Sequence, residues 1–298
     1  MRIATNTIHD TVVRQIQLLG TQTSKLQTQV ATGQRILSAD EDPAASARVL
    51  NHQSELRRVD QFDENAARAI EISQATFAGL RDVKEISDRA TELATLGRAP
   101  SGPEALGAYS AEVNQLIEQL LQVGNTRLGN DYLFAGTAVD APAYSATRDA
   151  NGNVTAVTYD GNNSLASIPL SEVASVAPGS NPDTNLAIRD LLNQLVSLRD
   201  ALASNDGAAL ATAQSSLING ENVLVTALAA NGAVQTRIEV NRAQQQGRGD
   251  SIVELLGRET NVDLPDAIVR LNQAQLAYQA ALQSSASIMK ISLLDYIR

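Results

Sequence analysis

The last stretch of the chain, from Leu264 to Arg298, constrains the fold most because its apolar residues recur at steps of three and four. This spacing is a heptad pattern, and it predicts one narrow apolar stripe on a helix roughly 50 Å long, at about 1.5 Å per residue. The stripe comprises Leu264, Ile268, Leu271, Tyr278, Leu282, Met289 and Tyr296. A rod with a single stripe cannot fold alone, so it needs a partner helix.

The residues before this stripe predict where the helix begins. Asp263 stands at an N-cap position, Pro265 lies in the first turn, and Asp266 follows three residues after the cap. This arrangement resembles a capping box, which satisfies free backbone N–H groups at a helix start. We therefore expect the helix to begin near Leu264.

The N-terminal segment carries a second helical stripe and is the expected partner. Its apolar positions are Val12, Ile16, Leu19, Leu26 and Val30, with Gln, Thr and Ser on the other faces. The stripe stops near Gly33. We expect the two chain ends to pair as helical rods.

A connector from Gln34 to Pro43 contains three consecutive acidic residues, Asp40, Glu41 and Asp42. A calcium loop needs a longer and more widely spaced ligand set. An acidic residue just before a proline and a helical pattern is instead typical of a capping turn. We interpret the trio as the cap of the next helix.

The middle of the chain predicts more long helices. One runs from Ala44 to about Leu96, and a second follows the short turn from Gly97 to Gly102, with Ser101 and Glu104 forming a capping box. The short turn predicts that these two helices are antiparallel. Helical spacing resumes at Ile188 and continues to Ile238, and two glycines, Gly247 and Gly249, put the continuity of that later helix in question.

Between these helical parts the pattern changes to β-structure. Asn151-Gly152 separates the segments Tyr144–Arg148 and Val154–Tyr159, and a third segment covers Leu165–Leu170. Such dipeptides between short alternating runs predict a β-hairpin. Asn162-Asn163-Ser164 matches a glycosylation sequon, but it lies in an evident turn and is common by chance.

The expected architecture is mainly α, with long antiparallel bundle or coiled-coil rods formed by both chain ends and a small inserted β domain. We expect three parts. Residues 1–43 and 255–298 form the paired terminal rods. Residues 44–137 and 184–254 form a helical core domain. Residues 138–183 form a small β insertion.

Composition excludes several classes of function. The net charge of −10 and the isoelectric point near 4.7 argue against a nucleic-acid or membrane-surface partner. The chain has no cysteine, which rules out disulfides and thiol chemistry and suits passage into an oxidising space. The N-terminus lacks the apolar core of a secretory signal, so any export is expected to leave no cleaved leader.

An enzyme is the rival class, and the sequence gives it little support. The two histidines are followed by Asp10 and Gln53, so no HExxH metal motif exists, and no GxSxG, P-loop or GxGxxG motif occurs. No nucleophile, base and orienting group stand in a catalytic pattern. We expect no catalytic activity, no cofactor and no metal.

Several motifs resemble the flagellin superfamily and, within it, the subunits that join hook to filament. They are LQTQVATGQRI at Leu26–Ile36, the turn Glu41-Asp42-Pro43-Ala44, GNDYLFAGT at Gly129–Thr137 and ISLLDYI at Ile291–Ile297. The opening Met-Arg-Ile and the final Leu-Leu-Asp-Tyr also fit this resemblance. The likeness extends over both helical arms and the start of the β insertion.

The resemblance implies an extracellular structural subunit of the bacterial flagellum, exported unfolded through the flagellar type III apparatus with an export chaperone. It also implies that the terminal rods are the inner assembly domain and that the β insertion faces outward. It further implies partners: copies of the chain in a helical ring, a hook-associated protein on the hook side and flagellin on the filament side. The expected assembly interface consists of residues on both terminal stripes: Val12, Leu19, Leu26, Val30, Ile268, Leu271, Tyr278, Leu282, Met289 and Tyr296.

Two alternatives remain open at this point. The chain could be a short flagellin of the filament itself. It could also be a surface adhesin, because Arg248-Gly249-Asp250-Ser251 resembles an integrin ligand. A motif of this kind acts only when the fold presents it.

Overall fold

The structure is a computed structural model that describes the backbone of residues 2–100 and 102–296 and the side chains of residues 10–100 and 102–287. The chain forms two compact units. Unit 1 contains residues 1–58 and 248–298, and unit 2 contains residues 59–247. The fold is mainly α with a few small antiparallel strand pairs, which confirms the predicted fold class.

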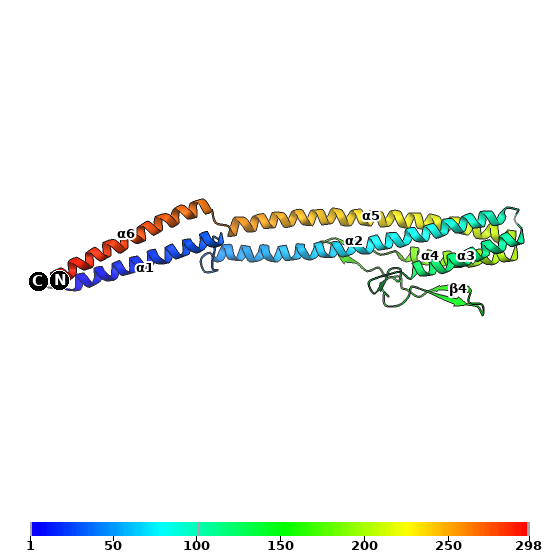
Figure 1. Ribbon diagram of the computed structural model, residues 1–298, viewed down its shortest axis with the longest axis horizontal. Coiled ribbons are helices and arrows are strands. Elements are labelled where there is room, and N and C mark those ends of the chain that lie inside the picture. Colours follow the sequence, from blue (N-terminus) through cyan, green and yellow to red (C-terminus); the bar gives the residue numbers. More distant parts are fainter. Residues whose placement is uncertain (1, 101, 297–298) are drawn as a thin grey trace. The chain divides into compact units, whose positions relative to one another are not determined.

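Six helices run through the described residues (Figure 1): α1 (Arg2–Thr32), α2 (Pro43–Arg98), α3 (Pro103–Gly124), α4 (Pro182–Ser204), α5 (Gly207–Thr260) and α6 (Leu264–Tyr296). α6 begins at Leu264 as predicted, and Asp263 accepts a hydrogen bond from the backbone N–H of Asp266 at 3.2 Å. α5 is continuous through Gly247 and Gly249, which answers the question that these glycines raised.

The start of α3 differs from the prediction. The N-cap is Gly102, no side chain caps the helix, and Pro103 takes a first-turn position. Ser101, the expected cap, lies outside the described residues. Proline suits this position because its fixed φ is helical and its missing N–H has no partner to lose.

Within the described ranges, six short strands form three antiparallel pairs. β1 (Arg127–Leu128) pairs with β2 (Asp131–Tyr132), β3 (Tyr144–Arg148) with β4 (Val154–Tyr159), and β5 (Ile168–Pro169) with β6 (Ser175–Val176). β3 and β4 have the predicted bounds, and Gly152 in their turn has φ +87°. The third predicted segment, Leu165–Leu170, contains only the two-residue strand β5.

Two asparagines fix the β3–β4 hairpin to the helices of unit 2. Asn125 donates to the carbonyl of Tyr144 at 2.9 Å and accepts from its N–H at 3.0 Å. Asn193 of α4 does the same for Val157, at 3.0 and 2.9 Å. Each side-chain amide thus supplies the hydrogen-bond donor and acceptor that a neighbouring strand would supply, so the hairpin needs no further strand beside it.

The β segment contributes to the core of unit 2 and does not stand apart as a separate part. One buried cluster joins α2, α3 and α4 with β-segment residues. Its largest members include Leu80, Leu93, Ile117, Leu120, Phe134, Tyr144, Ile188, Leu191, Leu195 and Leu198. Residues 138–183 therefore fall in one compact unit with the helices on either side.

Phe134 and Gly136 belong to the motif GNDYLFAGT at Gly129–Thr137, and the structure shows why each is needed. Phe134 is fully buried, and a Cβ on Gly79 of α2 would lie 2.9 Å from its ring. Gly136 has φ +69°, and a Cβ there would collide with the carbonyl oxygen of Asn162. The side chain of Asn162 accepts from the N–H of Thr137 at 2.9 Å, so the sequon asparagine holds this turn together.

Candidate assembly interface

The two terminal helices pair in unit 1, where Figure 1 shows α1 and α6 side by side. α1 presents a heptad row of buried and half-buried residues, in which Thr23 fills the gap between Leu19 and Leu26. Tyr278 of α6 packs over Gly20, where an added Cβ would lie 3.5 Å from its ring. The contact places the middle of one helix against the middle of the other.

The buried row of α6 is not the row that its large residues predict. The residues that face α1 are buried or half-buried and mostly small: Ala267, Leu271, Ala274, Tyr278, Ala281 and Ser285. They follow steps of four and three, so the seam is a heptad pattern in a neighbouring register. Small residues on α6 leave room for the larger side chains of α1.

The predicted interface residues fall into three groups in the structure. Leu26 is buried, and Val12, Leu19, Val30, Leu271 and Tyr278 are half-buried in the seam. Ile268 and Leu282 are 45% and 42% exposed, so they lie outside the seam. The side chains of Met289 and Tyr296 lie outside the described residues.

The heptad pattern does not identify four large apolar side chains that are exposed on the terminal pair. On α6 these are Val269 and Leu276, and on α1 they are Val13 and Leu18. Leu276 is 66% exposed. The heptad pattern favours the largest apolar residues as the seam. These four residues are recognisable in the sequence as apolar residues that lie outside the heptad pattern.

The exposed surface of the terminal pair carries little charge. No charged residue occurs from Gln15 to Ser24 of α1 or from Leu271 to Met289 of α6. Between the helices lies a groove of about 600 Å³, whose lining includes Leu19, Leu26, Ala274 and Ala277 together with the charged residues Lys25 and Arg270. Exposed apolar side chains on the uncharged stretches are typical of a face that other proteins cover.

A joint lies where α1 gives way to α2 and α5 gives way to α6. The backbone N–H of Arg35 donates to the carbonyl of Thr260 at 2.7 Å, and that of Val262 donates to the carbonyl of Gly33 at 2.9 Å. Gln34 and Asn261 form an antiparallel bridge. The two breaks in helical structure are thereby fastened to each other.

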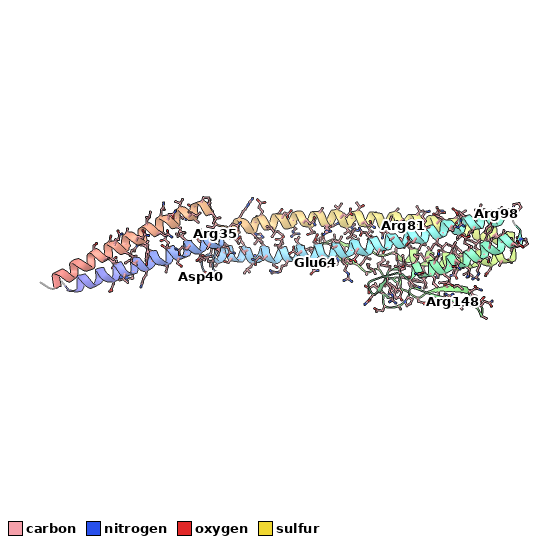
Figure 2. All side chains as sticks on the ribbon, viewed as in Figure 1. Arg35, Asp40, Glu64, Arg81, Arg98 and Arg148 are labelled. Carbon is pink, nitrogen blue, oxygen red and sulfur yellow. The ribbon has the colours of Figure 1, made fainter. Side chains whose placement is uncertain are left out.

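Charged side chains close this joint around Glu259. Arg48 donates to both carboxylate oxygens of Glu259, at 2.9 and 3.0 Å, and Arg35 donates to its carbonyl oxygen. The hydrogen bond from Arg48 lowers the pKa of the Glu259 carboxyl, and the positive charges of Arg48 and Arg35 lower it further. Figure 2 labels Arg35 at this break.

The acidic connector acts as the predicted capping turn. Asp42 accepts a hydrogen bond from the N–H of Ala45 at 2.9 Å, and this bond is the first cause that lowers the pKa of Asp42. Glu41 pairs with Lys25 at 3.0 Å. Among the residues that the structure describes, no group of three or more His, Asp or Glu side chains could hold a metal ion.

The integrin-like tetrapeptide lies inside α5. Its Arg248 donates to the carboxylate of Glu55 at 3.1 Å through Nε. A helical backbone does not present these residues as an extended loop would. This placement disfavours the adhesin alternative. Within the described part of the chain, no helix has the length and apolar content to span a bilayer.

Comparisons with known proteins agree with this geometry. Residues 3–139 match the bacterial flagellin N-terminal helical region, so the resemblance to the flagellin superfamily is confirmed over this part of the chain. No curated protein sequence matches the chain.

The solved structures define the fold more narrowly, as that of flagellar hook-associated proteins. A flagellar hook-associated protein from Vibrio parahaemolyticus superposes with a TM-score of 0.67 at 16% identity, over 74% of this chain and 100% of its own. FlgL from Bacillus cereus gives 0.57 at 15% identity, over 70% and 99%. Hook-associated protein-3 from Legionella pneumophila gives 0.58 at 11% identity, over 70% and 98%.

Proposed function

We propose that this chain is a structural subunit of the bacterial flagellum that joins hook to filament. Copies of the chain assemble as a helical ring between a hook-side hook-associated protein and flagellin. The flagellar apparatus exports the chain unfolded, with the help of a chaperone, and the subunit works outside the cell. It has no catalytic role in this proposal.

The observation that carries the proposal is the set of exposed apolar side chains on the α1–α6 pair, whose residues 15–24 and 271–289 include no charge, in a chain with a flagellin N-terminal region. The seam within one copy uses small residues of α6 and leaves Leu276 and Leu282 in water. Burying such side chains contributes about 1.5–3 kcal/mol each. Neighbouring copies or flagellar partners would supply that burial, and assembly would be driven by it.

The test places one charge on this surface without disturbing the fold. Leu276→Asp and Leu50→Asp are matched, because Leu276 is 66% and Leu50 of α2 is 64% exposed. Both free subunits should fold, since exposed sites tolerate substitution within about 0.5 kcal/mol. In a deletion strain complemented with each variant, Leu276→Asp should lower the number of attached filaments at least tenfold, whereas Leu50→Asp should leave it near normal.

The readouts are electron microscopy for attached filaments and a blot for exported subunit. Exported Leu276→Asp protein with normal filaments would contradict the proposed surface. Failure of the unmodified gene to restore filaments would contradict the junction role itself.

The remaining alternative is a short flagellin that builds filament. Purified unmodified protein distinguishes the two functions, because a filament subunit extends without limit once seeded. A junction subunit should stay soluble until it meets a hook end.

A further inference from the structure

The turn between β3 and β4, Asp149–Asn153, contains one of three Asn-Gly dipeptides in the chain, Asn151-Gly152. The other two, Asn219-Gly220 and Asn231-Gly232, lie within α5. An asparagine before a glycine is prone to lose ammonia, because the glycine has no side chain that hinders attack of its nitrogen on the asparagine amide. The three dipeptides share this chemistry and differ in their place in the fold.

The reaction takes place within the chain and needs only water. The backbone nitrogen of the glycine gives up its proton and attacks the side-chain carbonyl carbon of the asparagine. The new C–N bond closes a succinimide ring, and the side-chain nitrogen leaves as ammonia. Water then opens the ring at either carbonyl, which yields aspartate or iso-aspartate. The glycine N–H must first leave its hydrogen bond, and the backbone must be able to rotate.

Asn151 lies where both conditions are met. Asn151 and Gly152 are exposed, and a Cβ on Gly152 would meet no atom within 4 Å, so the space around this glycine is open. The N–H of Gly152 donates to the carbonyl of Asp149 at 3.1 Å. This hydrogen bond lies in an exposed turn, where local opening costs far less free energy than it does in a core helix.

The helix α5 denies both conditions to its own dipeptides. A glycine N–H inside a helix donates to the carbonyl four residues earlier, and the helix holds the backbone in one conformation. Asn231 is also buried, and its side-chain oxygen accepts from the hydroxyl of Ser73 at 3.1 Å and from Gln235 at 2.9 Å. Asn219 is exposed, as Asn151 is, so it isolates the effect of the helix.

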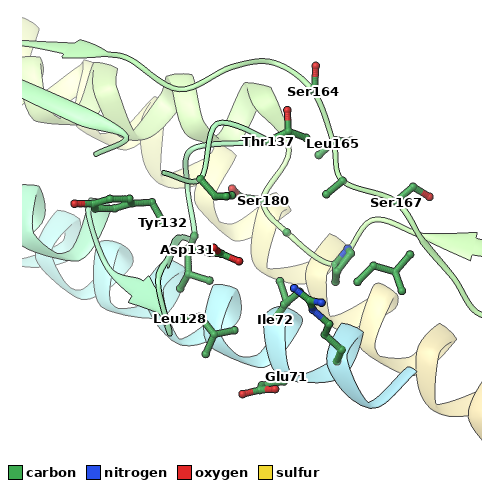
Figure 3. Close-up of a pocket in the computed structure, with 18 of the residues that line it drawn as sticks. Glu71, Ile72, Leu128, Asp131, Tyr132, Thr137, Ser164, Leu165, Ser167 and Ser180 are labelled. Carbon is green, nitrogen blue, oxygen red and sulfur yellow. The ribbon is translucent and has the colours of Figure 1, made fainter. Parts of the chain in front are cut away.

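A turn alone is not sufficient for the reaction, as Asn162 shows. Its side-chain oxygen accepts from the N–H groups of Thr137 at 2.9 Å and Ser164 at 3.1 Å, and its amide nitrogen donates to the hydroxyl of Thr137 at 2.7 Å. Figure 3 shows Thr137 and Ser164, which these hydrogen bonds join. Asn163 follows, and its side chain hinders attack. The side-chain amide of Asn151 makes no hydrogen bond with any residue that the structure describes.

We propose that Asn151 is a site of spontaneous modification, at which the subunit is converted to aspartate and iso-aspartate, and that α5 protects Asn219 and Asn231. The conversion adds a negative charge to the turn, because a neutral amide becomes a carboxylate. It does not depend on the junction function, since the reaction consumes water and releases ammonia without any partner.

The iso-aspartate product should loosen the turn. Its backbone is longer by a methylene group, whereas the contacts of the turn fit the present length. Asp149 accepts from the N–H of Asn153 at 2.8 Å, and Arg148 donates to the carbonyl of Gly152 at 2.9 Å. Val154 directly after the turn is buried in the core of unit 2, so the strands themselves should stay in place.

The test follows all three dipeptides in one sample of the purified full-length protein. The protein is kept in mildly alkaline buffer, and its peptides are separated and weighed by mass spectrometry at intervals, since conversion replaces –NH2 by –OH. In the folded protein, Asn151 should convert about tenfold or more faster than Asn219 and Asn231, because a helix interior rarely opens. In protein unfolded with guanidinium chloride, the three rates should agree within a few-fold.

Equal rates for Asn151 and Asn219 in the folded protein, or no conversion of Asn151, would overturn the assignment. So would an advantage of Asn151 that persists in the unfolded protein, because the local sequence and not the fold would then cause it. Asn151→Gln should remove the modified peptide, and a modified peptide that survives this substitution counts against Asn151. Hydrogen exchange at the turn should be faster in the iso-aspartate fraction, and unchanged exchange would overturn the predicted loosening.

Discussion

The terminal pair of unit 1 and the core of unit 2 are both helical, yet they are stabilised differently. In unit 2, large side chains such as Phe134, Tyr144 and Leu195 are fully buried among three or more elements. In the α1–α6 pair, the buried residues among the described side chains are Leu26, Thr23 and small residues of α6. Free energy from burial scales with the apolar area removed from water. Unit 2 should therefore be stable in one copy, whereas the terminal pair should depend on neighbours.

The largest expected effect comes from removing residues 138–183 and joining the ends with a Gly-Ser linker. Tyr144, Val154 and Val157 all belong to the core of unit 2, and each buried side chain contributes about 1.5–3 kcal/mol. Their loss is comparable to the whole stability of a domain, about 5–15 kcal/mol. We expect the cooperative melting transition in circular dichroism to disappear. A retained transition would mean that the β segment is a separate insertion after all.

Phe134→Ala tests the same core at one position. Phe134 fills the space above Gly79, and truncating a buried Phe costs about 3–5 kcal/mol. The free energy of unfolding of unit 2, measured with urea, should fall by that amount and the urea midpoint should fall with it, whereas Val173→Ala, at an exposed valine between β5 and β6, should leave both unchanged. Equal midpoints for Phe134→Ala and the unmodified protein would place Phe134 outside the core.

Leu26→Ala probes the terminal pair. It removes the one large buried side chain of the described seam, at a cost of about 2 kcal/mol, the low end for such changes because its neighbours are small. Limited proteolysis should cut α1 and α6 of the free subunit faster than in the unmodified protein, while the urea midpoint of unit 2 stays constant. A drop in that midpoint would show that the two units unfold together.

The smallest effect concerns the ion pair between Asp63 and Arg242, which joins α2 and α5 in unit 2 at 2.9 Å. Hydrogen bonds from Arg242 lower the pKa of Asp63. The pair therefore stabilises the fold above the unfolded pKa of about 4, and this stability is lost as pH falls through the lower folded pKa.

Both side chains of this pair are about a third or more exposed, so solvent limits the effect to about 1 kcal/mol or less. Asp63→Asn should lower the urea midpoint slightly at pH 7 and not at pH 2. A larger difference at pH 2 than at pH 7 would reverse the assigned sign.

The sequence predicts the helices well because their apolar spacing is long and regular, and it predicts β3 and β4 from the Asn151-Gly152 turn between them. It does not predict the face that α6 buries. Ala267, Ala274 and Ser285 are buried because they are small enough for α1 to approach, and small residues give no hydrophobic signal. Contacts such as that of Phe134 with Gly79 join residues far apart in the chain, so the sequence around one residue does not predict the other. The two-residue strands are too short to show alternation.

The joint around Arg35 also has a consequence for the order in which the molecule folds. Arg35 and Glu259 are 224 positions apart, so their contact closes a loop that includes all of unit 2. Closing a long flexible loop costs more entropy than closing a short one. Once unit 2 has folded, Asp63 and Arg242 already meet, and only short arms remain to be joined. The joint and the α1–α6 pair should therefore form after unit 2, because folded unit 2 shortens the loop that they have to close.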